Sequence, residues 1–369
     1  MSKEVERRIA RELARAEAAG SCLCPTSRAD RAALERRLGH VRDNPERRII
    51  SPIPGLYVRW AHWRLLKQPA RCLHLMRGLA ALHPDWVFCG PSAAMVHGLS
   101  VSWSELRRVH VICGPRDGRR LSGRIVRHQI EGEEPQVVAG LRVTSALRAA
   151  FDCMSVMDFP DALAIADSVL RLSGMRNTTL MSLMRRDFRG RRGIARVLAT
   201  CCWADPRPEN GGESVAREIM IERGVALPAL QVELVDPLDE RRRFRVDFSW
   251  LGKDGRPSVG ELDGLIKYTG ELFSDAMTLD DVLRGERRRE ARVTAYDVRV
   301  ARFSLDEIRN DESFWKIIEL YRIPYGPAPE KVHGIPVFRA HIEGWRPGLG
   351  EDDFVTPEGM HVRYRVVAA

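Results

Sequence analysis

The stretch from Gly212 to Phe303 constrains the fold most, because acidic residues interrupt apolar runs of the length of a β-strand. Asp247 stands inside one such run, Glu261 inside another, and Asp263 two residues later. Residues two apart on a strand share a face, so Glu261 and Asp263 should point the same way. A carboxylate among apolar neighbours is costly to bury unless something compensates it. We therefore expect these acids to gather around a compensating charge.

The same stretch predicts a compact mixed domain. Its elements, in chain order, are a helix at 213–223, strands at 230–235, 244–250 and 258–262, a longer helical region, and a strand at 298–303. The segment 205–212 before it is rich in Pro, Gly and Asn, which is typical of a linker. We place this α-β-β-β-α-β domain at 211–322.

The N-terminal 64 residues predict a winged helix. A helix at 4–19 and a second, capped by Ser27 and running through Leu38, precede two short extended pieces at 49–58. These 64 residues hold 14 Lys and Arg against 8 Asp and Glu, a net charge of +6, which suits contact with DNA. The expected contacts are Arg28, Arg31, Arg36 and Arg37; a solvated helix face is the alternative.

Between these parts, residues 65–200 alternate helices and strands and predict an α+β middle domain. The expected helices are at 65–82, 91–97, 145–153 and 161–172, and the expected strands at 86–89, 109–113, 124–129 and 141–143. No catalytic constellation stands out there. Residues 323–369, rich in Pro and Gly, predict an irregular surface tail with one short strand at 337–342.

Composition narrows the class of protein. The 369-residue chain carries a net charge of +9, mostly from Arg, which favours a nucleic-acid partner, although a GC-rich genome also produces such a composition. No apolar run reaches the ~18 residues of a membrane span, and the charged start lacks a signal peptide, so we expect a cytoplasmic location. The eight Cys form no C-x-x-C pair; those within apolar runs, such as Cys89 and Cys113, should be buried thiols.

A divalent metal is the natural compensation for the acids. Two or three carboxylates hold Mg²⁺ and leave water positions open, so Asp247, Glu261 and Asp263 are the expected ligands. The ion would activate water and neutralise charge on a phosphate. Lys267 would add a positive charge near the reacting phosphate.

Three strings with these acids resemble a known superfamily of nucleases. They are Gly212-Glu213-Ser214, Val246-Asp247-Phe248, and Val259-Gly260-Glu261-Leu262-Asp263-Gly264 followed by Lys267-Tyr268. The stretch 211–307 resembles the PD-(D/E)xK nucleases, and most closely the very-short-patch repair endonucleases of actinobacterial type. The resemblance implies a restriction-endonuclease-like fold, with Glu213 as the acid of the first helix and Asp247 and Glu261 as metal ligands.

One position departs from that pattern. Asp263 stands where the superfamily has Lys, so Lys267 would serve from one helical turn later or would pair with Asp263 in a structural salt bridge. The string Glu286-Arg287-Arg288-Arg289-Glu290 matches the family's last motif. Arg287 and Arg288 are therefore expected to contact DNA phosphates.

The N-terminal 200 residues resemble a second family, the AbiEi antitoxins. The resemblance rests on the predicted winged helix followed by Ser92-Ala-Ala-x-x-x-Gly98 and Gly140-Leu-Arg-Val-Thr-Ser145. AbiEi proteins are DNA-binding repressors of abortive-infection toxin–antitoxin systems, which implies a toxin as partner.

Two functions follow. The first is a DNA-directed, Mg²⁺-dependent endonuclease acting in defence or repair, with Glu213, Asp247, Glu261 and Lys267 as its catalytic residues. The second is a non-catalytic repressor or antitoxin whose nuclease-like domain only grips DNA or a partner. If the site is a nuclease site, Asp247 and Glu261 should lie on neighbouring strands and share one face, with Glu213 facing them from the helix.

Overall fold

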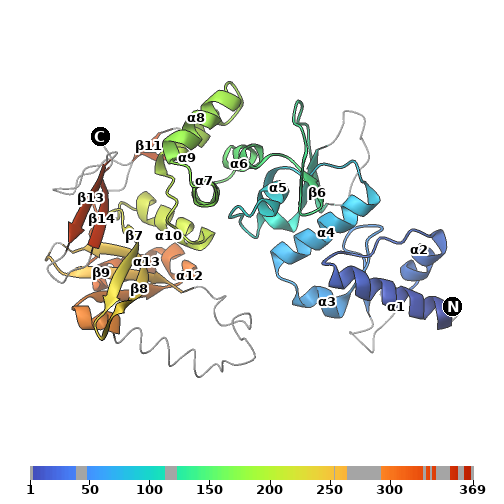
Figure 1. Ribbon diagram of the computed structural model, residues 1–369, viewed down its shortest axis with the longest axis horizontal. Helices are drawn as coiled ribbons and strands as arrows, with labels where there is room; N and C mark the ends of the chain where they lie inside the picture. The colour runs from blue at the N-terminus through green and yellow to red at the C-terminus, as the bar shows by residue number, and fades with distance from the viewer. Residues whose placement is uncertain are drawn as a thin grey trace. The chain divides into compact units, whose positions relative to one another are not determined.

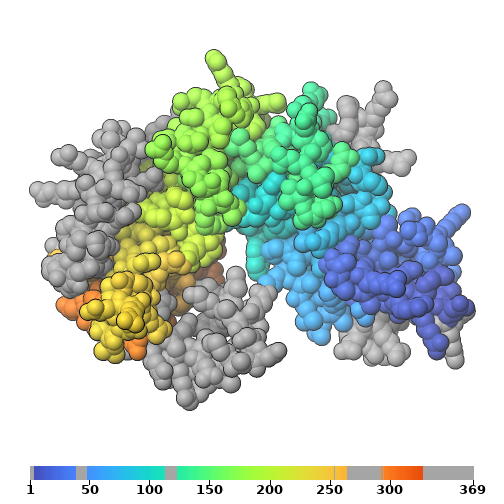
Figure 2. Space-filling model, in the orientation of Figure 1, coloured from blue at the N-terminus to red at the C-terminus, as the bar shows by residue number. Residues whose placement is uncertain are grey.

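The computed structural model describes most of the chain, and Figures 1 and 2 show it in ribbon and space-filling form. The described residues are 3–38, 48–112, 123–252, 254–263, 292–326 and, for the backbone alone, 330–332, 335–337, 350–355 and 361–366. They form two compact units, Met1–Val156 and Met157–Ala369. Both contain helices and small sheets, so the predicted mixed, multi-domain class is confirmed at this level. No helix among the described residues has the length and apolar character needed to cross a membrane.

The first unit begins with two helices and a two-stranded sheet. They are α1 (Lys3–Ala18), α2 (Arg28–Glu35), β1 (Ile49–Ile50) and β2 (Val58–Arg59), and the two strands pair antiparallel. The Ser27 hydroxyl accepts the Asp30 N–H and caps α2, as the sequence predicts. Helix α2 ends three residues before the predicted Leu38. The elements expected of a winged helix are thus present, and the winged-helix fold itself stays a prediction.

The remainder of the first unit packs helices against short strands. The elements are α3 (Trp60–Leu65), α4 (Gln68–Leu82), α5 (Gly90–Val96), η2 (Glu105–Arg107), β3 (Val109–Ile112), β4 (Ile125–His128), β5 (Gln136–Val138), β6 (Leu141–Val143) and α6 (Ala146–Met154). Strands β3 and β4 are parallel, and β5 pairs antiparallel with β6. The predicted strand at 86–89 is reduced to single bridges from Phe88 to Val111 and Val143.

The second unit opens with four helices. They are α7 (Phe159–Ser173), α8 (Asn177–Asp187), α9 (Ile194–Trp203) and α10 (Gly211–Glu222). Gly174 ends α7 in the left-handed conformation at φ 69°, a C-terminal position where glycine costs least. Phe159, Leu163 and Trp203 pack with Ile221 at the end of α10, so α7 and α9 support the helix that carries Glu213.

A four-stranded sheet forms the centre of the second unit, in the order β10-β9-β8-β7. The strands are β7 (Ala229–Asp236), β8 (Asp239–Leu251), β9 (Pro257–Leu262) and β10 (Arg299–Phe303). Neighbours pair antiparallel except β9 and β10, which are parallel. The longer helical region predicted before β10 falls on 264–291, outside the described residues.

Two apolar clusters pack against this sheet. Helix α10 packs on one face together with α12 (Leu305–Arg309) and α13 (Asp311–Leu320), around Phe248, Trp250 and Phe303. Residues Val293 and Val298 pack with Val246 and Val259 in the second cluster. A Cβ on Gly260 would come within 3.1 Å of both Trp250 and Phe303, so only glycine lets these aromatic rings close over β9.

The tail carries more regular structure than the sequence predicts. Its strands pair as two antiparallel hairpins, β11 (Glu330–Val332) with β12 (Ile335–Val337) and β13 (Gly350–Val355) with β14 (His361–Val366). Of the strand expected at 337–342, only Val337 falls within the described residues, at the end of β12.

Candidate functional site

Asp247 and Glu261 lie across from each other where the β8–β9 ladder ends. The last registered pair is Phe248 with Gly260, and the next residues along the two antiparallel strands are Asp247 and Glu261. The Asp247 carboxylate accepts the backbone N–H of Leu262 through Oδ2, at 2.9 Å. In a regular ladder this N–H would bond to the backbone of β8. The side chain of Asp247 therefore reaches across to β9 and ends the backbone pairing beside Glu261.

Glu213 is held in a fixed orientation at the start of α10. Its side chain is 4% exposed, and its carboxylate accepts the backbone N–H of Glu209 at 2.7 Å and the Asn210 side-chain amide at 2.6 Å. Asn210 in turn caps the helix by accepting the Glu213 N–H at 3.1 Å. These reciprocal bonds hold the carboxylate near the positive end of the helix dipole, where negative charge is favoured.

Gln231 on β7 joins Glu213 to Asp247. Its amide Nε2 donates to Glu213 Oε2 at 2.9 Å and lies 3.4 Å from Asp247 Oδ1, at the outer limit of a hydrogen bond. Gln231 has a φ of 54°, which is uncommon for a residue other than glycine, and it lies opposite Asp247 between the registered pairs of β7 and β8. The structure thus brings Glu213 and Asp247 together through a residue that the sequence analysis did not single out.

Glu261 is paired with a cation. It is 8% exposed, and its Oε2 lies 3.1 Å from the Arg302 guanidinium on the neighbouring strand β10. Register explains the pairing, because Arg302 is the registered partner of Glu261 in the parallel β9–β10 pair. Arg302 was also missed in the sequence, where an arginine in a strand predicts only a solvent-facing position.

Of the other residues predicted for the site in the second unit, the structure describes only Asp263. Asp263 lies just past β9 with an exposed side chain, and its backbone N–H donates to Phe303 O at 2.9 Å. Lys267, Arg287 and Arg288 lie outside the described residues. Among the residues that are described, no three His, Cys, Asp or Glu side chains form a group that could hold a metal ion. The predicted convergence of Asp247, Glu261 and Asp263 on one ion stays a prediction.

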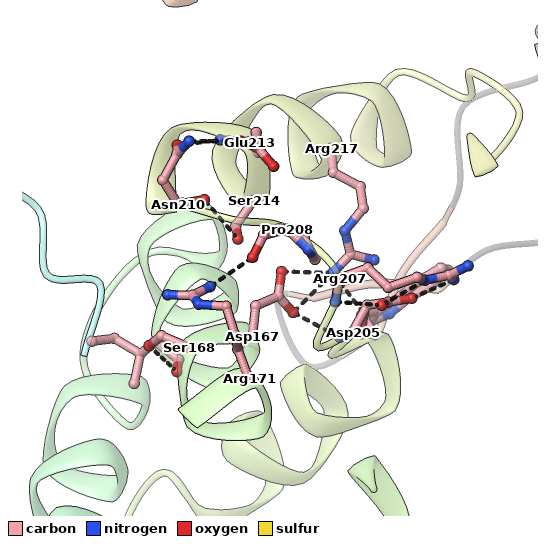
Figure 3. A network of polar contacts seen from close by, with 12 residues as sticks. Asp167, Ser168, Arg171, Asp205, Arg207, Pro208, Asn210, Glu213, Ser214 and Arg217 are labelled. Atoms are coloured by element: carbon pink, nitrogen blue, oxygen red, sulfur yellow. Dashed lines mark hydrogen bonds and ion pairs between the residues drawn. The ribbon is translucent and has the colours of Figure 1, made fainter. Parts of the chain in front are cut away.

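A buried polar network fixes the helix that carries Glu213 (Figure 3). The Arg217 guanidinium donates to both oxygens of Asp167 on α7, at 2.9 and 3.0 Å, and to the Trp203 carbonyl at 2.9 Å. Asp167 also accepts the backbone N–H of Asp205 at 2.8 Å. Burial raises the pKa of Asp167, and Arg217 opposes that shift. The network locks α10 against α7 one helical turn after Glu213.

The segment predicted as a linker is part of this network. Asp205 is 2% exposed and accepts the backbone N–H of Arg207 at 3.0 Å and its guanidinium at 2.7 and 2.9 Å. Arg171 on α7 donates to the Pro208 carbonyl at 2.6 Å. A segment of linker composition is therefore bonded to α7 on one side and leads directly into the site helix on the other.

The four N-terminal arginines predicted to contact DNA differ in their surroundings. Arg28 and Arg31 are exposed on α2, and Arg36 is exposed at its C-cap. Arg37 lies beyond the helix, is half-buried, and donates to Glu6 on α1 at 2.9 Å. Arg37 thus ties α1 to the end of α2, whereas the other three lie open to a ligand.

Most of the cysteines that the structure describes are buried core thiols. Cys22, Cys72, Cys89, Cys153 and Cys201 are buried, as apolar surroundings predicted for Cys89, and Cys113 is outside the described residues. Burial raises the pKa of Cys22, Cys72 and Cys201 to about 12, so these thiols stay protonated and unreactive.

Comparisons with known proteins add two relatives. No family model and no solved structure matches the chain. Two uncharacterized proteins from two strains of Mycobacterium tuberculosis, MT2308 and Rv2248, are each 30% identical to the chain over 164 residues. The match covers 44% of this chain and 58% of each relative, so the chain spans less than two thirds of the length of these relatives.

Proposed function

We propose that residues 211–322 form a metal-dependent endonuclease-like domain of the PD-(D/E)xK type, which nicks or cleaves DNA in defence or repair. The observation that carries the proposal is the placement of Asp247 and Glu261 across the end of the β8–β9 ladder. Glu213, joined to Asp247 through Gln231, adds a third carboxylate from the helix. A site of this kind needs acids from one helix and two neighbouring strands.

The donor set suits Mg²⁺ better than a softer metal. Mg²⁺ is commonly held through one or two carboxylates together with waters and substrate phosphate, which the pair Asp247 and Glu261 would provide. When bound, the ion would supply an activated water and neutralise charge on the attacked phosphate. Asp263, exposed at the end of β9, is the additional ligand that the proposal assigns.

The residues around the pair would position it. Gln231 and the Leu262 N–H fix the two oxygens of Asp247, and such second partners orient a ligand and sharpen its affinity for the ion. Arg302 places a guanidinium beside Glu261, where it would favour a phosphate. Lys267 is the second cation of the proposed site.

A second candidate function is a non-catalytic repressor or antitoxin. It is favoured by the pairing of Glu261 with Arg302, because this ion pair compensates the carboxylate without a metal. In that case the N-terminal helices, with exposed Arg28, Arg31 and Arg36, would carry DNA binding, and the second unit would only support the complex.

Plasmid nicking in Mg²⁺ and in EDTA tests the proposal. We expect Asp247→Asn and Glu261→Gln each to lower Mg²⁺-dependent cleavage by at least ~10²-fold, a loss typical of one preorganised charge in an active site. Asp254→Asn is the matched control, because Asp254 precedes β9 at its other end and pairs with Arg299. If the wild type cleaves no DNA substrate with Mg²⁺, Mn²⁺ or Co²⁺, the repressor function replaces the nuclease.

The same assay separates the two cations. Lys267→Ala and Arg302→Gln should each be measured for cleavage and for DNA affinity. Removing a cation that acts on the transition state lowers the cleavage rate and leaves DNA affinity unchanged. Removing a purely structural partner changes neither the rate nor the affinity. An inert Lys267→Ala together with an inactive Arg302→Gln would move the role predicted for Lys267 to Arg302.

A further inference from the structure

A second basic surface lies on the second unit, at the turn between α8 and α9. Residues 185–192 contain five arginines and one aspartate, a net charge of +4. All five arginines are exposed, and Figure 2 shows side chains of α8 and its following turn projecting from the surface. We call Arg185, Arg186, Arg189, Arg191 and Arg192 the arginine turn.

Among the residues that the structure describes, little of this charge is neutralised. Arg186 donates to its neighbour Asp187 at 2.5 and 2.9 Å. Within the described residues, the other four arginines form no ion pair and donate no side-chain hydrogen bond. Holding like charges this close in one turn is unfavourable unless a ligand compensates them. Segment 185–192 therefore presents four guanidinium groups that pair with none of the described residues.

The backbone under the arginine turn is fixed. Met184 and Phe188 are buried on its inner side, at 0% and 6% exposure, and anchor the end of α8. Gly190 and Gly193 have φ values of 75° and 85°, a conformation that favours glycine, and they let the chain reverse tightly into α9. A fixed turn loses little backbone freedom on binding, so only the arginine side chains have to be ordered by the ligand.

The side chains present favour phosphate over bases as the ligand. Binding of single strands uses exposed aromatic rings as stacking platforms. In the segment 185–192, all of which is described, the only aromatic side chain is the buried Phe188. Guanidinium groups match phosphate oxygens in a bidentate fashion. The chemistry is that of a surface for the sugar-phosphate backbone.

We propose that the arginine turn binds the phosphate backbone of duplex DNA and holds it on the same unit as Asp247 and Glu261. The inference rests on the proposed function for its choice of DNA. Helices α8, α9, α7 and α10 pack in succession, which connects the turn rigidly to the helix that carries Glu213. The second unit then grips DNA itself, independently of the N-terminal arginines.

The test is the salt dependence of duplex binding, measured by fluorescence anisotropy of the full chain in EDTA, so that no cleavage occurs. Each phosphate contact contributes about 0.9 to the slope of log K against log salt, so Arg189→Gln with Arg191→Gln should flatten it by up to ~1.8. Neutralising Arg185, Arg189, Arg191 and Arg192 together should reduce the fall in affinity between 50 and 200 mM salt by up to ~10²-fold. Arg189→Lys with Arg191→Lys should keep most of the slope.

The matched control removes the same charge from the same unit. Arg309 and Lys316 are exposed cations that already pair with Asp306 and Glu312, so Arg309→Gln with Lys316→Gln should leave the slope nearly unchanged. Equal slopes for the wild type, the control and the fourfold variant would overturn the proposal. It would also be overturned if binding of single-stranded DNA, RNA or anionic vesicles depended on these arginines more strongly than binding of duplex DNA does. If the arginine variants flatten the slope but the wild type cleaves no DNA, the proposed role of the arginine turn stands and only the nuclease function is rejected.

Discussion

In the first unit two pairs of histidines meet ring to ring, whereas in the second a fully buried carboxylate pairs with a buried guanidinium. His110 and His128 on β3 and β4 meet with Nδ1 and Nε2 at 2.9 Å, and His62 and His74 meet with their Nε2 atoms at 3.1 Å. A short contact between two ring nitrogens needs one donor and one acceptor, so at least one ring of each pair is neutral.

In the second unit, two buried side chains of opposite charge compensate each other. Asp167 and Arg217 are 0% and 4% exposed at their side chains and compensate each other between α7 and α10. Because of this difference, acid should affect the stability of the two units in opposite directions once the Asp167–Arg217 pair is broken. Protonation of buried neutral histidines at low pH destabilises the first unit. Protonation of a buried carboxylate that has lost its partner stabilises the second unit.

The largest effect is expected for Arg217→Met. Removing one partner of a buried ion pair leaves the other charge uncompensated and typically costs about 3–5 kcal/mol. Burial already raises the pKa of Asp167, and loss of Arg217 raises it further. A raised carboxyl pKa in the folded state means that stability falls as pH rises above about 3.8, so the variant should be less stable at pH 8 than at pH 5.

Hydrogen exchange of α7 and α10, corrected for intrinsic rates, measures this effect for the second unit alone. The first unit provides the internal control, and its exchange should not change. A variant that is as protected as the wild type at pH 8 would show that the pair contributes nothing net.

The next effect is the acid response of the first unit. Burial, together with His128 and Arg108, lowers the pKa of His110 from 6.5 to about 4. The unfolded chain then binds the proton more readily, so stability is present above pH 6.5 and up to about 3 kcal/mol is lost as pH falls to 4. His110→Phe should flatten this dependence.

Exchange in β3 and β4 between pH 7 and pH 4.5 is the measurement. The wild type should lose protection there more steeply than in α7 and α10. Identical slopes for wild type and His110→Phe would contradict the assignment of the acid response to this histidine.

The smallest effect is expected for Arg59→Gln. Arg59 donates to Glu17 from its side chain, with Nε at 2.8 Å, but its side chain is 43% exposed. Solvent weakens such a pair, and the Arg59 backbone N–H still donates to Glu17 at 2.9 Å after the substitution. We expect a loss of about 1 kcal/mol, reduced by salt, in a denaturation of the first unit. A loss as large as that of Arg217→Met would erase the distinction between the units.

Periodicity predicted most helices and strands to within a few residues, because each has one clearly apolar face. The N-cap Ser27 was likewise predicted from residue type and position. Helices α12 and α13 were not predicted, although Ser304 and Glu307 form a capping box that marked the start of α12. Strand β5 was missed because it has only three residues and two of them are exposed, so it shows no apolar alternation.

The candidate site divides in the same way. Asp247 and Glu261 were singled out because an acid within an apolar run is conspicuous in the sequence, and Glu213 because Gly212-Glu213-Ser214 resembles a family motif. Gln231 and Arg302 were not, since a lone polar residue in a strand agrees with ordinary alternation. Their roles arise from register and from the left-handed φ of Gln231, and no local pattern in the sequence records either.

The ion pair between Asp167 and Arg217 also determines where the chain can be cut without separating two buried charges. The acid belongs to α7 and the guanidinium to α10, on opposite sides of the segment that composition marks as a boundary. A fragment that begins at Gly211 would carry a buried arginine away from its counter-ion, whereas one that begins at Met157 keeps both. The module that recombination or truncation would have to move intact therefore includes the four helices before the sheet as well as the sheet with its acids.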